Sequence, residues 1–483
     1  MWKWLILDRY SRKAQLLCAI LSALISGCSG QAVAPDLGGI YNRAAQTEDL
    51  DRNPVIVIPG ILGSRLKDAE SGSLSWGAFG GGSIDPTTPE GIRSIALPMR
   101  IGVPLSQLED EVIPDGVLSK LKISLLGLPL ELNAYREILN TLGAGGYRDQ
   151  DLAAGGDVNY GSDHFTCFQH AYDWRRDISE SAAILGEFIL ARRAYVQKEI
   201  ERRFGISNHP VKFDIVAHSM GGLLARYYLM YGTAPLPEDG SIPEPTWEGA
   251  RYVGRLIMIG TPNAGSVHAF RELVEGVQFS AITPKYEAAL LGTMPAVYQL
   301  LPRPRHRAII DLDKPDHLLD IYSADEWIRR GWGLADSEQE KVLEALLPDV
   351  GDPALRRETA IDHLRKSLGR AKQLAEALDR TAQPPPTLSI YLIAGDSEPT
   401  PAVLGLRDSE EELKVVRSAP GDGTVLRSSA LLDERVGSNW TRRLSSPIPW
   451  RHVTFIFRDH LALTQDPIFT DNILFLLLEQ SKA

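Results

Sequence analysis

The segment Ala217-His218-Ser219-Met220-Gly221 places a serine between a predicted strand and a predicted helix. Small residues two positions before and after the serine let strand and helix pass closely, as in a nucleophile elbow with alanine in place of the first glycine. The turn holds the hydroxyl at a strained apex, and the helix that follows begins with a positive field. Ser219 is therefore a candidate nucleophile for acyl transfer, provided that a base takes its proton.

An acid and a base follow this serine in the chain order that a nucleophile elbow requires. Asp422 lies in the glycine-flanked turn of "APGDGTVLRSS", and His460 follows the last predicted strand in "FIFRDHLALTQDP". Loops at strand ends carry the active site in open α/β sheets. We expect His460 to take the proton of Ser219 and Asp422 to orient the imidazole.

Other acids and histidines compete for these roles. Asp396 directly follows a predicted strand in "IAGDSEP" and is an alternative acid. His452 precedes its strand, so we expect it at the opposite end of the sheet. His218 is next to the nucleophile but should point away from it, which indicates a structural role.

An acyl-transfer site also needs two backbone N–H groups that bind the oxyanion. One is expected from Met220, the residue after the nucleophile. The other should come from the loop after the first strand, in "IPGILGSRL", where Gly60 and Gly63 let the backbone approach closely. We expect Ile61 to supply that second N–H.

The elements that would position these residues alternate between strands and helices. Such alternation is typical of an α/β fold with a mostly parallel central sheet and helices on both faces. Apolar runs predict strands at residues 55–58, 164–171 and 211–217 and in "GRLIMIGTP", "PTLSIYLIAGD" and "HVTFIF", with helices at 179–204, from 220 onward and in "IFTDNILFLLLEQ".

Two long segments interrupt this alternation within a single predicted domain, residues 54–483. Residues 67–90 are rich in glycine and serine and are expected to form a lid loop. Residues 267–386 lose the strand pattern and show apolar residues at helical spacing, which predicts an inserted helical cap.

The first 53 residues are expected to be export and tether sequence. Residues 1–27 combine basic residues with an apolar stretch too short to span a bilayer comfortably, as in a signal peptide. The small residues before Cys28 resemble a bacterial lipoprotein cleavage site, which makes Cys28 the predicted lipidation site and 28–53 a tether. The sequence thus predicts an exported lipoprotein of the outer membrane or facing the periplasm. A plain secretory signal and an uncleaved anchor are the alternatives.

Composition excludes some functions. The formal net charge is −11 and the pI is about 5.5, with no clustered basic face, so no nucleic-acid partner is expected. The histidines lack metal-ligand spacing, and neither a metal nor an organic cofactor is implied. Cys167 is the one cysteine left after Cys18 and Cys28, so no disulfide is expected, and its apolar neighbours indicate a buried core thiol.

Several motifs occur together in an order that resembles the lecithin–cholesterol acyltransferase family of α/β-hydrolases. They are "VIVIPGILGSRL", "AYDWRR", "AHSMGG", "IGTPNAGS", "GDGTV" and "DHLAL". The resemblance implies an α/β-hydrolase fold. It also implies that Ser219 is the nucleophile, Asp422 the acid and His460 the base, with oxyanion donors at Ile61 and Met220.

The resemblance extends to residues around the site. It implies that Asp173, Trp174 and Arg175 mainly shape the site and the sheet edge. Trp76 resembles the aromatic residue of the family's early lid region, although it could simply pack the lid onto the body. Vertebrate members close the lid loop with a disulfide, for which this chain has no cysteines there.

These features predict an exported serine O-acyltransferase or lipase that acts on a lipid ester, either a phospholipid or an acylglycerol. The acyl group would pass through Ser219 to water or to an alcohol acceptor. A carboxylesterase or polyester depolymerase with the same three residues is a second hypothesis. A lipoprotein that binds lipid through an inactive hydrolase fold is a third. The membrane is an expected partner through a lipid on Cys28.

Overall fold

The computed structural model describes ten segments of the chain, namely residues 36–77, 84–118, 121–125, 128–132, 134–161, 163–278, 283–316, 318–407, 413–438 and 440–481. The chain divides into two units, Met1–Ile40 and Tyr41–Ala483. Of the first unit, only residues 36–40 are described, and residues 37–40 belong to helix α2 (Leu37–Gln46). The predicted signal peptide and Cys28 lie outside the described residues. All the other described elements belong to the second unit.

A six-stranded parallel sheet forms the centre of this second unit, in the order β14-β11-β9-β8-β1-β7. The predicted fold class is confirmed. All the strands point the same way, so their carboxyl ends share one edge of the sheet. Their bounds are β1 Val55–Ile58, β7 Cys167–Gln169, β8 Phe213–His218, β9 Val253–Ile259, β11 Ser389–Gly395 and β14 His452–Ile456.

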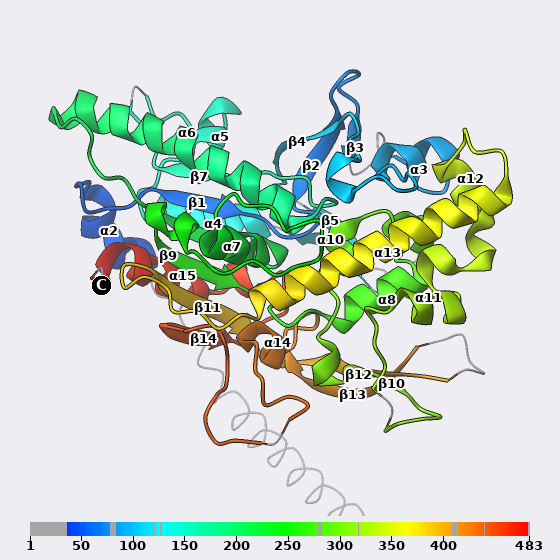
Figure 1. Ribbon diagram of the computed structural model, residues 1–483. Helices are drawn as coiled ribbons and strands as arrows, with labels where there is room; N and C mark the ends of the chain where they lie inside the picture. Colours follow the sequence, from blue (N-terminus) through cyan, green and yellow to red (C-terminus); the bar gives the residue numbers. More distant parts are fainter. Residues whose placement is uncertain are drawn as a thin grey trace, which may run out of the picture. The chain divides into compact units, whose positions relative to one another are not determined.

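Helices cover both faces of the sheet, which explains why its strands are almost continuously apolar. Alternate residues of β1 enter different clusters: Ile56 and Ile58 pack with α6 (Ile178–Phe204) and α7 (Met220–Tyr231). Val55 and Val57 pack on the opposite face with α4 (Ala134–Ala144) and α15 (Pro467–Leu474). Figure 1 shows α6 and α7 running along the same side of the strands.

The long helix α6 has clear end signals. The Asp177 carboxylate accepts a hydrogen bond from the Ser179 N–H at its start, at 2.8 Å. Gly205 closes it in the left-handed region, at φ 69°. The observed start is one residue before the predicted Ser179, and the predicted end at Phe204 is confirmed.

The segment expected to form the cap is mostly helical but also contains a strand. Its helices are α8 (Val267–Glu275), α9 (Ala288–Leu291), α10 (Pro295–Tyr298), α11 (Ala324–Arg330), α12 (Glu340–Leu346) and α13 (Pro353–Leu378). The strand β10 (Ile309–Asp311) joins β12 (Glu398–Leu406) and β13 (Lys414–Gly421) in a separate sheet. The sequence did not predict β10, because a strand of three residues is too short to show an apolar periodicity. Figure 1 shows α13 as the long helix that crosses this part of the unit.

The segment expected to form the lid contains regular structure where it is described. It includes part of β2 (Ser64–Asp68), β3 (Leu74–Trp76) and the start of α3 (Pro89–Ile95), and β2 pairs with both β3 and β4 (Val112–Val117). Residues 78–83 lie outside the described part. The remaining elements are β5 (Leu121–Leu125), β6 (Leu128–Leu132), α5 (Gln150–Ala154) and α14 (Arg427–Leu431).

A buried ion cluster joins the end of α3 and the chain that follows it to the chain that leaves β7. The Arg175 guanidinium is fully buried and contacts the Asp173 carboxylate at 2.7 Å and that of Asp110 at 2.8 Å. It also donates to the Ile95 carbonyl at the end of α3, at 3.1 Å. Each charge therefore has a partner, and the cluster fixes α3 beside the chain that leaves β7.

Replacing Arg175 with alanine should destabilise the protein strongly. Asp173 would keep its buried charge without its main partner, which typically costs about 3–5 kcal/mol. Urea unfolding of the folded variants measures the loss. The matched control is Arg202→Ala, which breaks an exposed pair with Glu199 and should change stability far less. Equal losses for the two variants would contradict a structural role for the Arg175 cluster.

Candidate active site

Ser219 occupies a strained turn between β8 and α7. Its backbone has φ 52° and ψ −126°, outside the range that side-chain-bearing residues ordinarily adopt. Two glycines make this turn possible: a Cβ on Gly221 would lie 2.4 Å from the Pro59 carbonyl oxygen, and one on Gly222 would lie 2.0 Å from Thr261 Oγ1. The glycines let α7 approach β1 and β9 closely enough to hold the serine at the sheet edge.

The three predicted residues meet at this edge. His460 Nε2 lies 3.0 Å from Ser219 Oγ, and His460 Nδ1 lies 2.8 Å from Asp422 Oδ2. Ser219 follows β8, Asp422 follows β13 and His460 lies in the loop after β14. The arrangement forms a continuous hydrogen-bonded chain from carboxylate to imidazole to hydroxyl, which is the geometry of an activated serine nucleophile.

The carboxylate of this chain is held by its own loop. Asp422 Oδ1 accepts hydrogen bonds from the N–H groups of Thr424 at 3.0 Å and Val425 at 2.6 Å. The His460 N–H donates to the Asp422 carbonyl at 2.8 Å. Gly395 gives the loop room, since a Cβ there would lie 2.6 Å from the Asp422 Cβ. The glycine at the end of β11 therefore lets a carboxylate from a neighbouring sheet reach the histidine.

Opposing effects act on the His460 imidazole. Burial, the largest of them, lowers its pKa, whereas the charge and hydrogen bond of Asp422, with the charge of Asp459, raise it. The net result is a pKa above the ordinary value of about 6.5. Asp422 therefore stabilises the protonated imidazole that would form when the serine loses its proton.

The two predicted oxyanion donors lie beside the serine. Met220 is the first residue of α7, where a backbone N–H has no acceptor within the helix. Ile61 lines the same cavity as Ser219, and the preceding Gly60 packs so closely that a Cβ on it would lie 2.7 Å from the Ser219 Cβ. Both residues therefore lie next to the serine, and donation by their N–H groups to an oxyanion stays a prediction.

A second set of residues supports the site, and the sequence did not reveal all of it. The Tyr135 hydroxyl accepts a hydrogen bond from the Gly60 N–H at 2.9 Å and lies 3.3 Å from His218 Nδ1. His218 Nε2 in turn lies 3.3 Å from the His460 carbonyl oxygen. Burial lowers the pKa of His218 to about 3, so this imidazole is neutral. His218 has the structural position expected of it, whereas no sequence signal linked Tyr135, on α4, to the site.

The rival residues lie elsewhere. Asp396 follows β11, and its carboxylate faces Arg427 at 3.6 Å. His452 begins β14 and is exposed, at the amino end of the strand. Neither residue contacts the Ser219–His460–Asp422 chain through a hydrogen bond or ion pair in the described part of the structure.

A mostly apolar cavity of about 150 Å³ opens beside the nucleophile. Trp76 and Trp174 form part of its wall, with ring centroids 5.5 Å apart. Each indole is anchored by a backbone carbonyl, Trp76 by Leu62 at 2.9 Å and Trp174 by Ser64 at 3.2 Å. Trp76 therefore packs the lid segment against Trp174, and both rings line the cavity. The aliphatic lining is Ile61, Leu62, Ile95, Ala269, Val277, Leu291, Met294, Val297, Leu300 and Val425.

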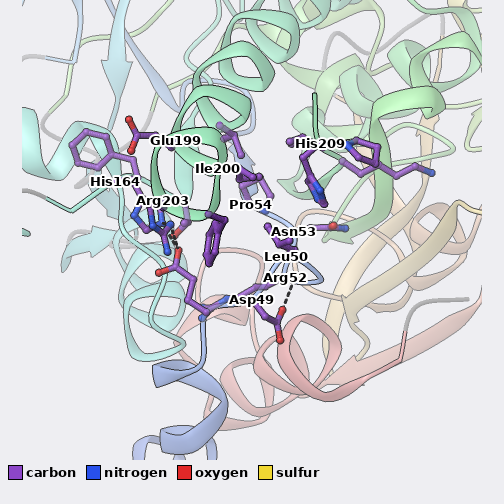
Figure 2. Close-up of a pocket in the computed structure, with 18 residues that line it drawn as sticks. Asp49, Leu50, Arg52, Asn53, Pro54, His164, Glu199, Ile200, Arg203 and His209 are labelled. Atoms are coloured by element: carbon purple, nitrogen blue, oxygen red, sulfur yellow. Dashed lines mark hydrogen bonds and ion pairs between the residues drawn. The ribbon is translucent and has the colours of Figure 1, made fainter. Parts of the chain in front are cut away.

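Another cavity, of about 60 Å³, lies at the opposite end of the strands, next to Asn53 and Pro54 (Figure 2). The Glu48 carboxylate there contacts Arg148 at 3.0 Å, Arg203 at 2.9 Å and also the His164 imidazole. Burial raises the pKa of Glu48, but hydrogen bonds from these partners lower it to about 2. The polar groups of this cavity therefore neutralise one another, which indicates a structural ion cluster.

Metal and thiol chemistry find no support among the described residues. No group of three or more metal-ligating side chains occurs there. Cys167 is a free, buried thiol in β7, and burial raises its pKa well above the ordinary value. It lies on a strand at the edge of the sheet, away from the nucleophile.

Comparison with known proteins supports the same fold. The family model of lecithin:cholesterol acyltransferase matches residues 156–325, which confirms the resemblance. A chain in the crystal structure of the Tle4-Tli4 complex superposes with a TM-score of 0.53 at 14% identity, covering 88% of this chain and 98% of that one. The likeness shows a shared fold. No curated protein sequence matches significantly.

Weaker structural similarity is found to two further proteins. EstA from Clostridium botulinum gives a TM-score of 0.35 at 13% identity, covering 90% of each chain. Lipase 1 from Pelosinus fermentans gives 0.33 at 13% identity, covering 89% of this chain and 100% of that one.

The pH profile should reveal the Asp422–His460 pair. A base must be neutral to accept a proton, so kcat/KM for an ester should rise as pH increases through the raised pKa of His460. Asp422→Asn removes the charge that raises this pKa and leaves burial, which lowers it. The rising limb should therefore move to lower pH, while the plateau falls by about 10⁴-fold.

The matched control is Asp396→Asn, which should retain both the rate and the profile of the wild type. A larger loss in Asp396→Asn than in Asp422→Asn would assign the acid to Asp396 instead.

Proposed function

Because residues 156–325 match the lecithin:cholesterol acyltransferase family, we propose that this protein is a serine-dependent enzyme of acyl transfer from lipid esters. One observation carries the proposal: the Ser219–His460–Asp422 hydrogen-bonded chain ends at a mostly apolar cavity. Ester carbonyls react with such a serine, and an apolar cavity suits the hydrocarbon part of a lipid.

In the first half-reaction, Ser219 Oγ attacks the ester carbonyl carbon while His460 Nε2 takes the hydroxyl proton. The carbonyl oxygen gains a negative charge, which the N–H groups of Ile61 and Met220 stabilise. His460 then gives its proton to the leaving alcohol, and the acyl group stays on Ser219. Asp422 keeps the imidazole oriented and stabilises its positive charge throughout.

In the second half-reaction, His460 takes a proton from an incoming hydroxyl, whose oxygen attacks the carbonyl carbon of the acyl-enzyme. The bond from that carbon to Ser219 Oγ then breaks, and His460 returns the proton to Ser219. Water gives a free fatty acid, whereas an alcohol gives a new ester. Both routes use the same groups, and the outcome depends on how well the cavity excludes water and binds the acceptor. The family resemblance supports the transfer route, and the same chemistry describes a lipase or phospholipase.

Two other functions remain candidates. A carboxylesterase or polyester depolymerase would use the same three residues on a different ester. A lipid-binding protein without activity would not need the hydrogen-bonded serine, histidine and aspartate, so their assembly argues against it.

We further propose that the protein is an exported lipoprotein, in the outer membrane or facing the periplasm, tethered by a lipid on Cys28. The proposal rests on the basic and apolar pattern of residues 1–27 and the small residues before Cys28. Within the part of the chain that the structure describes, no helix has the length and apolar character needed to cross a bilayer.

Phospholipid vesicles that contain a long-chain alcohol or a sterol test the proposed reaction. Free fatty acid and new ester are measured together, with the wild type and with Ser219→Ala. New ester that depends on Ser219 is expected if the chain is an acyltransferase, and fatty acid alone if it is a lipase or phospholipase. Ser219→Ala should lower either product by about 10⁴-fold or more. Equal products from both proteins would contradict serine catalysis.

Fractionation of cells that express the full chain tests the tether. Cys28→Ser should shift the protein from the membrane fraction to the soluble fraction, because the acceptor of the lipid is lost. Cys167→Ser, which changes the buried thiol in β7, is the matched control and should leave the protein in the membrane fraction. Membrane attachment of a Cys28→Ser protein that has lost residues 1–27, as read from its mass, would contradict lipidation at Cys28.

A further inference from the structure

The cavity beside Ser219 has a polar patch that the proposed mechanism does not use. His268 and Glu272 both line the cavity, and both belong to α8. A spacing of four residues places them on the same face of the helix, one turn apart. Most of the other lining residues are apolar, so a carboxyl and an imidazole there lose hydration unless a polar group pairs with them.

In the described part of the structure the protein supplies only part of that pairing, through a hydrogen bond between the His268 ring and the Gly423 backbone. His268 Nε2 is buried and makes no hydrogen bond there. Glu272 is half-buried, and its carboxyl makes no hydrogen bond or ion pair with a described residue. Burial raises its pKa to about 7 against the opposing charge of Arg271, and no hydrogen bond contributes to the shift. The nearest carboxylate to the Arg271 side chain is instead that of Glu275, at 3.9 Å.

The patch adjoins the reacting residues. The backbone N–H of His268 donates to Ser266 Oγ at 3.2 Å, and Ser266 Oγ donates to the Thr424 carbonyl at 2.9 Å. Thr424 belongs to the loop whose N–H groups hold the Asp422 carboxylate. The start of α8 is thus fixed to the Asp422 loop, and His268 lines the same cavity as Ser219.

Protonation determines which ligand group fits this patch. Burial is the largest effect on the pKa of His268 and lowers it, and the charges of Arg271 and His460 lower it further. A hydrogen bond with the Gly423 backbone and the charge of Asp422 act in the opposite direction. The net pKa is lower than the ordinary value, so the imidazole is neutral at neutral pH. Near pH 7 the Glu272 carboxyl is divided between its protonated and ionised forms. A hydroxyl group can donate to the ionised form and accept from the protonated one. An alkyl chain could pair with neither form of Glu272, and the ionised form would repel a carboxylate.

We propose that His268 and Glu272 form a hydroxyl-binding subsite, so that the preferred ester carries a hydroxyl group near the bond that is cleaved. The inference rests on the proposed function, because it specifies the substrate of the same site. The hydroxyl could belong to the acyl chain, as in a hydroxyacyl ester, or to the alcohol part, as in a glycerol ester. The experiment separates these two sources.

The test compares kcat/KM for two pairs of esters that differ by hydroxyl groups alone. The acyl pair is para-nitrophenyl octanoate and the corresponding hydroxyoctanoate. The alcohol pair is propyl octanoate and glycerol mono-octanoate. The proteins are the wild type, Glu272→Met, which keeps an unbranched side chain of similar length but cannot hydrogen-bond, and Glu272→Gln, which still can. Glu275→Gln, on the same helix but not in the cavity lining, is the matched control.

The wild type should prefer the hydroxylated ester in at least one pair. Glu272→Met should lower that preference by about 10-fold, the effect of one lost hydrogen bond. Glu272→Gln should retain most of the preference and Glu275→Gln all of it. If Glu272→Met does not fold, His268→Leu should show the same loss of preference.

Two results would overturn the subsite. One is a wild type that cleaves the plain esters with no hydroxyl preference in either pair. The other is a hydroxyl preference that is equally large in Glu272→Met and in the control Glu275→Gln. Neither result affects the proposed function, which fails separately if the wild type cleaves no ester faster than Ser219→Ala.

Discussion

The hydrogen bond between the Asp422 carboxylate and the His460 imidazole is the interaction on which the proposed chemistry depends. It joins two loops that arise from different sheets, since Asp422 follows β13 of the small sheet and His460 follows β14 of the central one. The β10-β12-β13 sheet therefore positions a reacting group. Gly395, at the end of β11, leaves room for the loop after β13 to bring Asp422 to the histidine.

Backbone constraint is the second requirement of the site. Ser219 holds a positive φ, which costs free energy that the surrounding packing must offset. Gly221 and Gly222 bring α7 against the neighbouring strands, and Gly60 brings the oxyanion loop against the serine itself. The buried Arg175 cluster then fixes the end of α3, and Trp76 packs against Trp174 in the cavity wall. The turn at Ser219 and the shape of the cavity therefore both depend on close packing of the surrounding loops and helices.

Much of this arrangement could be predicted from local sequence. The apolar run at residues 55–58 predicted β1 correctly, and the small residues around Ser219 predicted the turn. The strand expected at 164–171 is shorter, at Cys167–Gln169, because apolarity does not show where pairing with β1 stops. The contacts of Tyr135 and the position of Glu272 were not predictable, since they depend on how distant helices pack. Such residues have no motif, and only the folded chain brings them to the site.

Active-site labelling of the folded protein tests the central claim most directly. A fluorescent alkyl phosphonate reacts with a serine only when a neighbouring base activates the hydroxyl, and mass spectrometry of the peptides identifies the modified residue. One adduct is expected, on Ser219; it should be absent in Ser219→Ala and form much more slowly in His460→Ala. A folded wild type that stays unmodified, or that carries the adduct on another serine, would contradict this expectation.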